Sequence, residues 1–419
     1  MSSLTGSPLP ESVDVVVVGA GMAGLAAARV IHEAGLSAVV LESSDGVGGR
    51  VRTDEVDGFL LDRGFQVLLT AYPELHRQFD VSALDLRAFD PGALVWRNGR
   101  GYEVSDPFRK PTSLVSTALA PVGSPFDKAR IALLRRRVRT GHASQLLRGD
   151  DMTTRSLLES SGFSATMIER FFIPLVGGIQ LDPHLSASRR MFDVIFRMLA
   201  DGDAAVPARG MGQLSSQLAS RIPAESIHLS TPVVAVGSGE VRVAGDRAVK
   251  ARAVVVATEG PVARRLVDIP DVASRSVSCV YFAADRAPTA SKAIVLDGTG
   301  RGPVLNVAVM SNVSSSYAPP GRHLVAAAIP GRTDGDLEAD ARRQLTGMFG
   351  ASVATWRHLR TYSIAHGQPD QSPPFSPKKP VSLGHGLFVC GDHRDTASIQ
   401  GALYSGRRTG RAVVESLSS

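Results

Sequence analysis

The hydrophobic residues near the N-terminus form an unbroken run, which is the pattern of a strand buried on both faces. Val15 to Val18 are four consecutive valines, and β-branched side chains favour extended backbone. Residues 25–34 then follow a helical pattern that ends at Gly35, and residues 37–41 form a second apolar run. This order predicts a strand–helix–strand unit of a parallel sheet.

The rest of the chain divides into one long helical stretch and several short strands. Helical periodicity dominates residues 114–199, and another helix is expected at 336–349. Further strands, separated by Gly, Pro and Ser turns, are expected at residues 231–236, 253–258, 277–283, 293–296, 304–310, 323–329, around Trp356 and at 386–392. A final helix is expected from about residue 398 to 416, so the pattern predicts an α/β fold.

The glycine spacing after the first strand is typical of a dinucleotide site. Gly19 allows a tight turn, Gly21 lets the backbone approach a pyrophosphate, and Gly24 permits close helix–strand contact. Glu42 ends the second strand, where a carboxylate can accept hydrogen bonds from ribose hydroxyls. The expected dinucleotide contacts are therefore Gly19, Ala20, Gly21, Met22, Ala23, Gly24 and Glu42.

Two further segments indicate which dinucleotide is bound. The stretch Gly48-Gly49-Arg50 offers backbone donors and a cation to a long, doubly charged cofactor. Near the C-terminus, an apolar strand ends in Gly391-Asp392 before the last helix. With the glycine turn, these segments resemble the flavoprotein superfamily of amine oxidases, protoporphyrinogen oxidases and phytoene desaturases.

The resemblance implies noncovalent FAD and a GR2-type flavoprotein, in which a Rossmann-like FAD-binding domain is interleaved with an α+β substrate domain. The FAD-binding domain would comprise residues 12–85, 206–270 and 375–419, and the substrate-binding domain residues 86–205 and 271–374. Besides the glycine turn and Glu42, the resemblance implies cofactor contacts from Gly48, Gly49, Arg50, Gly64, Phe65, Gln66, Val234, Gly391, Asp392, Ser398 and Ile399. The last two residues would present helix N-terminal N–H groups to the flavin.

The chain has a single dinucleotide fingerprint, so no second site is expected for a nicotinamide cofactor. We expect an oxidoreductase that passes a hydride from a small organic molecule to the flavin and is reoxidised by oxygen, a quinone or another external acceptor. Ser398 stands where amine oxidases of the superfamily carry a Tyr, and residues 397–402 are closer to the matching segment of carotene desaturases. The segment 61–69 is likewise similar to desaturases.

These features favour a hydrophobic, isoprenoid-like substrate handled by a desaturase, oxidase or isomerase. Three alternatives stay open: a flavin amine oxidase, a protoporphyrinogen-type oxidase, and an FAD-binding protein without turnover. We assign no catalytic residue, because Lys292, Tyr362 and His366 fit an ordinary surface or loop role as well as a catalytic one. Cys279 and Cys390 are expected to be buried free thiols, and no metal site is expected.

Charge adds one feature to this picture. The formal net charge is +6, from 46 basic and 40 acidic residues, which describes a mixed surface without a nucleic-acid motif. Residues 128–139 are rich in arginine and, as a helix, would place Ile131, Leu134 and Val138 on one side. This pattern fits either a helix packed on its own domain or peripheral contact with a membrane. With no signal peptide or spanning segment recognised, we expect a cytoplasmic protein, with the inner face of a membrane as the open alternative.

Overall fold

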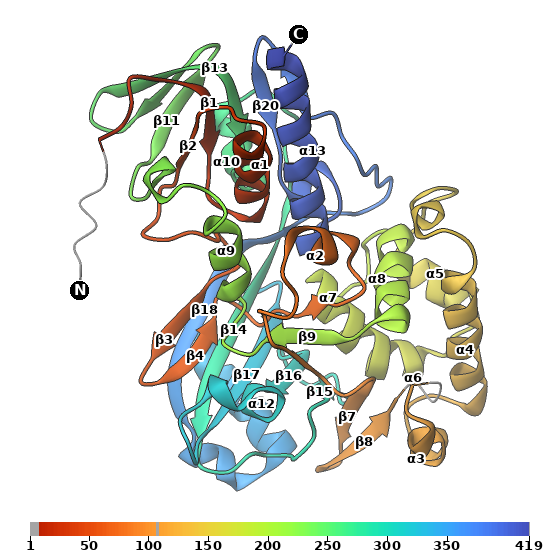
Figure 1. Ribbon diagram of the computed structural model, residues 1–419. Coiled ribbons are helices and arrows are strands. Elements are labelled where there is room, and N and C mark those ends of the chain that lie inside the picture. The colour runs from red at the N-terminus through yellow and green to blue at the C-terminus, as the bar shows by residue number, and fades with distance from the viewer. Residues whose placement is uncertain (1–7, 106–108, 419) are drawn as a thin grey trace.

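The computed structural model describes residues 8–105 and 109–418. Figure 1 shows a first sheet with α1 and α13 in the upper half, a second sheet below it, and a helical lobe beside the second sheet. The chain crosses between the two sheets several times, since both ends of the chain contribute to the upper one.

The first sheet contains eight strands and is parallel around its centre. β1 (Ser12–Val18) lies between β2 (Ala38–Leu41) and β13 (Arg247–Val256), in parallel with both. The other strands are β10 (Ile227–His228), β11 (Val233–Gly237), β12 (Glu240–Val243), β19 (Ser382–Gly384) and β20 (Leu387–Val389). Val15 to Val18 of β1 are buried, as their unbroken run predicts.

Two helices cover one face of this sheet by approaching each other closely. α1 (Met22–Glu33) begins three residues earlier than its periodicity indicated, and α13 (Ile399–Ser418) packs against it. A Cβ on Gly406 would lie 2.1 Å from the Ala23 carbonyl oxygen, so only glycine allows this contact. The N-terminal strand and the C-terminal helix therefore share one core.

The second sheet has seven strands in the order β18-β14-β17-β16-β15-β7-β8. They are β7 (Ala93–Arg97), β8 (Arg100–Val104), β14 (Ser274–Ala284), β15 (Ile294–Asp297), β16 (Asn306–Val309), β17 (His323–Pro330) and β18 (Arg357–Pro369). The four expected strands between 277 and 329 are present. β18 is much longer than the expected strand around Trp356, and the hairpin β7–β8 was not expected. α12 (Leu337–Phe349) packs against this sheet, close to its predicted bounds.

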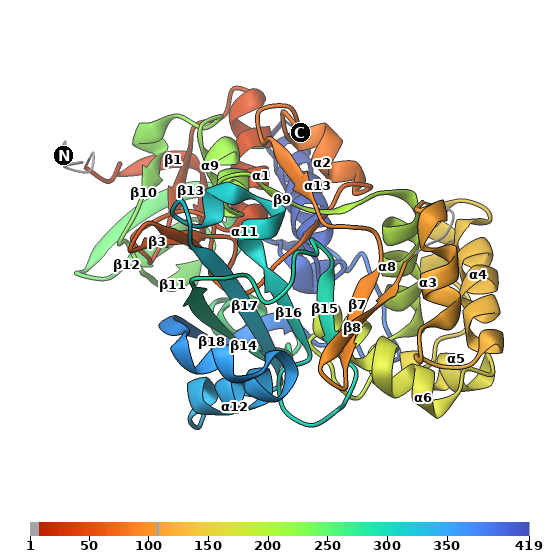
Figure 2. The ribbon, with the colours of Figure 1, turned by 90° about the horizontal axis from the view of Figure 1, so that it is seen from below.

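The expected helical stretch forms the lobe at the right of Figure 2. Its α-helices are α3 (Leu114–Leu119), α4 (Pro125–Arg139), α5 (Thr154–Ser160), α6 (Ala165–Met167), α7 (Gly178–Gln180) and α8 (Arg189–Asp201). Between α6 and α7, the residues Ile168–Gly177 form a π-helix around Pro174, whose missing N–H excludes regular α-helical bonding.

α4 settles how the basic segment 128–139 is oriented. Leu134 and Val138 are buried in the lobe, and Ile131 packs against the same core. The interpretation of these three residues as a membrane-facing side is therefore wrong, because they supply the core contact of α4. The residues on its outer face are considered separately below.

Smaller elements join the two sheets. They are β3 (Thr53–Val56), β4 (Phe59–Asp62), β5 (Leu68–Leu69), α2 (Pro73–Gln78), β6 (Leu86–Ala88), β9 (Ala204–Pro207), α9 (Gly212–Ala219), α10 (Gly260–Leu266) and α11 (Met310–Val313). Short 3₁₀ turns occur at Pro111–Ser113, Ala143–Leu147, Ala224–Ser226, Ser315–Tyr317, Ala351–Thr355 and Asp392–Arg394. α2 is joined to α13 by a buried ion pair, in which Arg407 Nη2 lies 2.7 Å from Glu74 Oε1.

Candidate functional site

The three fingerprint glycines differ in what surrounds them. Gly19 has φ +104°, and a Cβ there would lie 3.1 Å from the Ala257 carbonyl oxygen. A Cβ on Gly24 would lie only 1.9 Å from the Gly19 carbonyl oxygen, so helix and strand touch through the backbone. A Cβ on Gly21 would meet nothing within 4 Å, although Ala20 and Met22 on either side are buried. The space in front of Gly21 is thus open, as an approaching ligand requires.

The Glu42 carboxylate lies at the edge of this space, directly after β2. It accepts a hydrogen bond from the Ala20 N–H at 2.7 Å and another from the Ser44 N–H at 2.8 Å. The backbone of Glu42 is fixed as well, since its N–H donates to the His228 carbonyl and its own carbonyl accepts from Thr231. The carboxylate is 8% exposed and retains lone pairs that a ribose hydroxyl could use.

The Gly48-Gly49-Arg50 stretch lies against the glycine turn. The Gly48 N–H donates to the Ala20 carbonyl at 2.8 Å, and a Cβ on Gly49 would lie 3.5 Å from the Gly21 Cα. Arg50 extends from there to the C-terminal part of the chain. Its Nη2 lies 2.8 Å from Asp392 Oδ2, and its Nη1 donates to the Gly367 carbonyl at 2.7 Å.

The structure therefore brings together segments that are more than 300 residues apart in the sequence. Gly391 and Asp392 follow β20, and Gly391 has φ +147° with its N–H directed to the Ser405 hydroxyl at 3.2 Å. The glycine turn, Glu42, the Gly48-Gly49-Arg50 stretch and the Gly391-Asp392 pair form one continuous polar edge at the carboxyl ends of the parallel strands, where ligands of such sheets bind.

The segment from Gly64 to Gln66 lies beside Arg50. Gln66 Nε2 donates to the Arg50 carbonyl at 2.7 Å, which ties the two segments together. Gly64 has φ +89°, and a Cβ there would lie 2.9 Å from Ile364 of β18. Phe65 packs edge-on against Phe89 with ring centroids 6.2 Å apart. The segment thus connects the polar edge with the second sheet.

The start of α13 differs in detail from the expectation. The Ser398 N–H donates to the Thr396 carbonyl at 2.8 Å, and its hydroxyl accepts from the Gly401 N–H at 3.0 Å. Ser398 is therefore the N-cap of the helix, and its own N–H is engaged within the turn. Ile399 is the first helical residue. The buried Tyr72 hydroxyl also bonds to Ser398, and burial raises the pKa of Tyr72 to about 12.

Val234 lies on β11, the edge strand of the first sheet, and its side chain is 61% exposed. The chain reaches it from Ser230 and Thr231, whose N–H groups donate to the carbonyls of Ser44 and Glu42. Val234 thus follows the Glu42 end of the polar edge by three residues, at a bulge in its pairing with β12.

The candidate catalytic residues are placed as follows. Lys292 is exposed in the loop before β15, and the Tyr362 hydroxyl donates to Asp54 at 2.7 Å. The Nδ1 atom of His366 is buried without a hydrogen-bond partner in the described residues. Cys279 and Cys390 are buried free thiols, as expected. The described ranges contain no cluster of His, Cys, Asp and Glu that could hold a metal ion.

Two buried polar residues were missed by the sequence reasoning. His393 is 2% exposed next to Asp392, and neither ring nitrogen has a partner in the part of the chain described. Burial lowers the pKa of His393 to about 4, so the ring is neutral at pH 7. Gln180 at the end of α7 is 3% exposed, and both atoms of its amide group are equally unpartnered. A strand-end His and a lone helical Gln carry no sequence signal that distinguishes them.

A buried carboxyl group supports the loop that contains Gly64. Asp62 is 1% exposed and accepts hydrogen bonds from the Thr53 hydroxyl, the Met211 N–H and the Tyr317 hydroxyl at 2.5, 2.8 and 2.8 Å. Burial raises the pKa of Asp62 to about 6. The Tyr281 hydroxyl donates to the Asp62 backbone carbonyl at 2.9 Å. Asp62 therefore joins the hairpin β3–β4 to both α9 and the second sheet.

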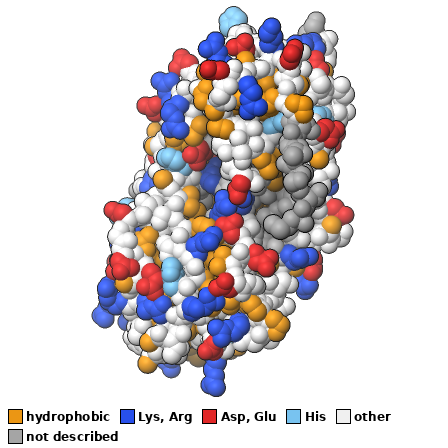
Figure 3. Space-filling view, turned by 90° about the vertical axis from the view of Figure 1, so that its left-hand side faces the viewer, with side chains coloured by type: hydrophobic (Ala, Val, Ile, Leu, Met, Phe, Trp, Pro, Cys, Tyr) orange, Lys and Arg blue, Asp and Glu red, His pale blue; other side chains and the backbone are white. Residues whose placement is uncertain are grey.

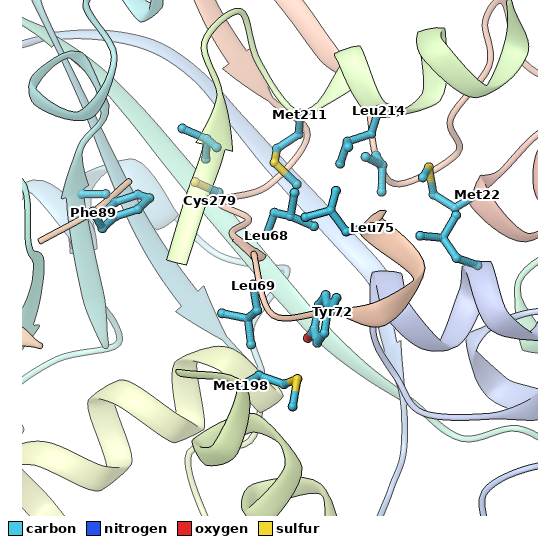
Figure 4. Packing of buried hydrophobic residues seen from close by; sticks show 14 of the residues in the cluster. Met22, Leu68, Leu69, Tyr72, Leu75, Phe89, Met198, Met211, Leu214 and Cys279 are labelled. Carbon is cyan, nitrogen blue, oxygen red and sulfur yellow. The ribbon is translucent and has the colours of Figure 1, made fainter. Parts of the chain in front are cut away.

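An apolar cluster lies on the other side of this loop. Figure 4 shows side chains that converge from β5, α2, α8 and α9 together with Cys279 of β14. Leu68, Leu69 and Met211 are almost fully buried, and Tyr72 and Met198 nearly so. Hydrophobic side chains thus extend from the Ser398 end of α13 toward the helical lobe.

The comparisons with known proteins agree with this geometry. The profile of the family described as "Flavin containing amine oxidoreductase" matches residues 22–414. Over 80 residues, 19% of the chain, the sequence is 39% identical to 15-cis-phytoene desaturase of Narcissus pseudonarcissus and 45% identical to putrescine oxidase of Kocuria rosea. These matches cover 14% and 17% of the two relatives.

Solved structures extend the likeness to the whole chain. Putrescine oxidase bound to putrescine superposes with a TM-score of 0.71 at 19% identity, over 96% of this chain and 99% of that one. Cyclohexylamine oxidase from Brevibacterium oxydans gives a TM-score of 0.72 at 17% identity, over 98% and 100%. At such identities the likeness concerns the fold, and it confirms the expected α/β architecture of a Rossmann-like domain with a substrate domain. The match over residues 22–414 means that the chain belongs to the family of flavin-containing amine oxidoreductases, a family of flavin-dependent oxidoreductases.

Proposed function

We propose that the protein binds FAD noncovalently and uses it to accept a hydride from a largely apolar, isoprenoid-like substrate. The observation that carries the cofactor proposal is the polar edge, where the open space at Gly21 meets Glu42, Arg50 and Asp392. When bound, FAD supplies the ring that accepts the hydride. The domain division expected from the sequence belongs to the same proposal.

The residues of this edge suit the parts of FAD by their chemistry. Glu42 is an acceptor for ribose hydroxyls, and the N–H groups at the start of α1 together with Arg50 suit a pyrophosphate. Asp392 is an acceptor for ribityl hydroxyls, and the unpartnered ring of His393 beside it fits a further polar group in this place. Backbone groups of Val234 suit adenine. The free, buried thiol of Cys390 fits noncovalent attachment.

The apolar substrate is inferred from Ser398 and its surroundings. Ser398 caps α13 and bonds Tyr72, so its side chain is not an aromatic wall that would enclose an amine. The neighbouring cluster of Leu69, Tyr72 and Met198 supplies hydrophobic surface instead. The external acceptor would be oxygen, a quinone or another oxidant.

Amine oxidation is the second candidate, because the structural relatives include a putrescine oxidase and a cyclohexylamine oxidase. A putative protoporphyrinogen oxidase from Exiguobacterium has the same fold, with a TM-score of 0.71 at 17% identity. Both alternatives use the same polar edge, so they differ from the first proposal only in the substrate.

The cofactor is tested by heat or acid release from the purified protein, where FAD is the expected product. Colourless protein that cannot be reconstituted with FAD would contradict the proposal. The substrate is tested by anaerobic bleaching of the flavin with a detergent-dispersed polyene, with putrescine and with cyclohexylamine. We expect only the polyene to bleach it rapidly. Turnover of a simple amine at kcat/KM on the order of 10⁴ M⁻¹s⁻¹ or above would favour the second candidate. Bleaching by none of a broad panel that includes porphyrinogens would favour a binding protein without turnover.

A further inference from the structure

Large hydrophobic side chains are exposed at six positions among residues 8–105 and 109–418, and four of these lie on α3 and α4. The exposed fractions are 67% for Val115, 78% for Leu119, 74% for Phe126 and 65% for Leu133. Exposed apolar side chains that are concentrated in one region mark a surface for interaction. These four residues are called the α3–α4 patch.

The two helices of the patch are held together where one ends and the other begins. Lys128 Nζ donates to the carbonyls of Ala118 and Ala120 at 2.6 and 2.8 Å, so the first turn of α4 caps the end of α3. Leu119 and Phe126 lie next to these contacts in the sequence. Figure 2 shows α3 beside α4 at the outer edge of the helical lobe, and in Figure 1 α3 lies below the lower end of α4. The patch is therefore a fixed part of the fold.

The two faces of α4 have opposite roles. Leu134 and Val138 face the lobe and are buried. Phe126, Leu133 and Arg136, which follow one another at helical spacing on the other face, are exposed. The outward face is thus apolar in its first half and basic in its second half, which is the composition of a helix lying at a membrane surface.

Basic side chains outnumber acidic ones around the patch. Residues 109–148 contain nine lysines and arginines but a single acidic residue, Asp127, which is buried. Arg109, Lys110 and Arg130 pair with Asp203, Glu103 and Asp127. Arg137 and Arg139 pair with aspartates of α8, whereas Arg136 forms no ion pair within the described part of the chain. The face in Figure 3, on the opposite side of the molecule, has interspersed basic and acidic side chains. The excess positive charge around the patch complements an anionic surface.

We propose that the α3–α4 patch docks the protein on an anionic lipid bilayer. Phe126 and Leu133 enter the boundary between headgroups and acyl chains, and the surrounding lysines and arginines contact lipid phosphates. A second copy of the chain is disfavoured as the occupant, because two like-charged surfaces would face each other. No helix of the described residues is long and apolar enough to cross a membrane.

The helix α8 lies between α4 and the apolar cluster shown in Figure 4. α4 packs on α8, whose Arg197 donates to the Val138 carbonyl at 3.1 Å. Met198, the next residue of α8, belongs to the cluster in Figure 4. α8 therefore contacts both α4 and the apolar cluster. The docking proposal itself is independent of the substrate, since lipid binding would hold for an amine oxidase as well.

The proposal is tested by co-sedimentation of the full-length, flavin-loaded protein with vesicles. We expect binding to phosphatidylcholine vesicles that contain phosphatidylglycerol, weaker binding to pure phosphatidylcholine, and loss of binding at high salt. The double variant Leu119→Ser/Phe126→Ser should lower the partition coefficient roughly ten- to hundredfold. Arg136→Glu should lower it about tenfold on anionic vesicles alone.

Two control variants change the charge or the exposed apolar surface outside the patch. Arg265→Glu changes an exposed arginine of α10 by the same two charges, and Met152→Ser removes an exposed apolar side chain outside the patch. Both controls should bind like the wild type, and all variants should keep their flavin spectrum and melting temperature. The proposal is overturned if the wild type does not bind anionic vesicles at low salt, or if the patch variants bind as well as the controls. A dimer in solution that the double variant converts to a monomer would overturn it in favour of self-association.

Discussion

The substitution Gly21→Ala tests the polar edge most directly, because the structure predicts an effect on cofactor binding without an effect on folding. Gly21 has φ −73° and ψ 177°, which alanine adopts without strain, and nothing of the protein lies within 4 Å of the added Cβ. We expect the apoprotein to stay within about 1 kcal/mol of the wild-type stability. A pyrophosphate in front of Gly21 would collide with the new methyl group.

The size of the binding defect follows from the cost of overpacking. Forcing a methyl group into occupied space costs about 1–3 kcal/mol, so the dissociation constant for FAD should rise roughly ten- to hundredfold. Titration of apoprotein with FAD, followed by flavin fluorescence, measures this change, and thermal melting of the apoprotein measures stability.

Two other glycines provide controls for this experiment. Gly347 of α12 is exposed, also has open space around its Cβ position, and is remote in sequence from every segment of the polar edge. Gly347→Ala should raise stability by about 0.5–1 kcal/mol without a change in FAD affinity. Gly24→Ala should prevent native folding, because its Cβ would lie 1.9 Å from a carbonyl oxygen. If Gly21→Ala binds FAD within twofold of the wild type, the reasoning about the polar edge is refuted.

Three further predictions concern buried carboxylates. Glu42→Gln turns an NH₂ group toward a backbone N–H, and it should weaken FAD binding by about 1.5–3 kcal/mol; an unchanged affinity in the same titration would exclude Glu42 as the ribose partner. Asp62 has its pKa raised from 3.8 to about 6, so its contribution to stability is present below pH 4 and lost as the pH rises through 6. Asp62→Asn should therefore be more stable than the wild type at pH 7.5, by up to about 3 kcal/mol, and should lose this advantage at pH 4. Urea denaturation measures the free energy of unfolding of both proteins, and an equal difference between them at the two pH values would contradict the prediction. Glu74→Gln leaves the side chain of Arg407 buried without its counter-charge and should cost about 3–5 kcal/mol, with the double variant Glu74→Gln/Arg407→Met recovering part of the loss; a melting temperature equal to the wild type would count against this pair as a link between α2 and α13.

The first sheet could be predicted because its signals are local. The valine run, the three glycines and Glu42 lie within a short stretch of the chain, and their roles depend on the local backbone. They can therefore be interpreted without knowing which distant residues they contact. The Arg50–Asp392 ion pair joins residues far apart in the sequence and was not predicted, because resemblance to a family implied only that each residue contacts the cofactor. Ser398 was correctly located at the start of the last helix, whereas its role as N-cap depends on the turn before it.

The parts that could not be predicted depend on tertiary packing. The apolar stripe of α4 would be buried either in the protein's own core or in a membrane. Only the fold shows that Leu134 and Val138 face the lobe and that Phe126 faces outward. β18 continues far beyond Trp356 because it pairs along the length of β14, which no local pattern reveals. The burial of Gln180 and His393 likewise results from segments that are distant in sequence.

The pairing of β13 with both β1 and β20 has a consequence for biosynthesis. During translation, the first strand of the cofactor sheet leaves the ribosome long before β20 and α13, which complete its sheet and cover α1. β1 can pair with β2 and β13 earlier, but its sheet and the cover of α1 are completed only by β20 and α13, in contrast to domains that fold in order from the N-terminus. Arg50 can pair with Asp392 only after that segment has been made, so we expect cofactor loading to follow the synthesis of β20. Nascent chains stalled before residue 387 should consequently remain flavin-free and depend on chaperones, while the edge of β13 that β20 would pair is open to aggregation.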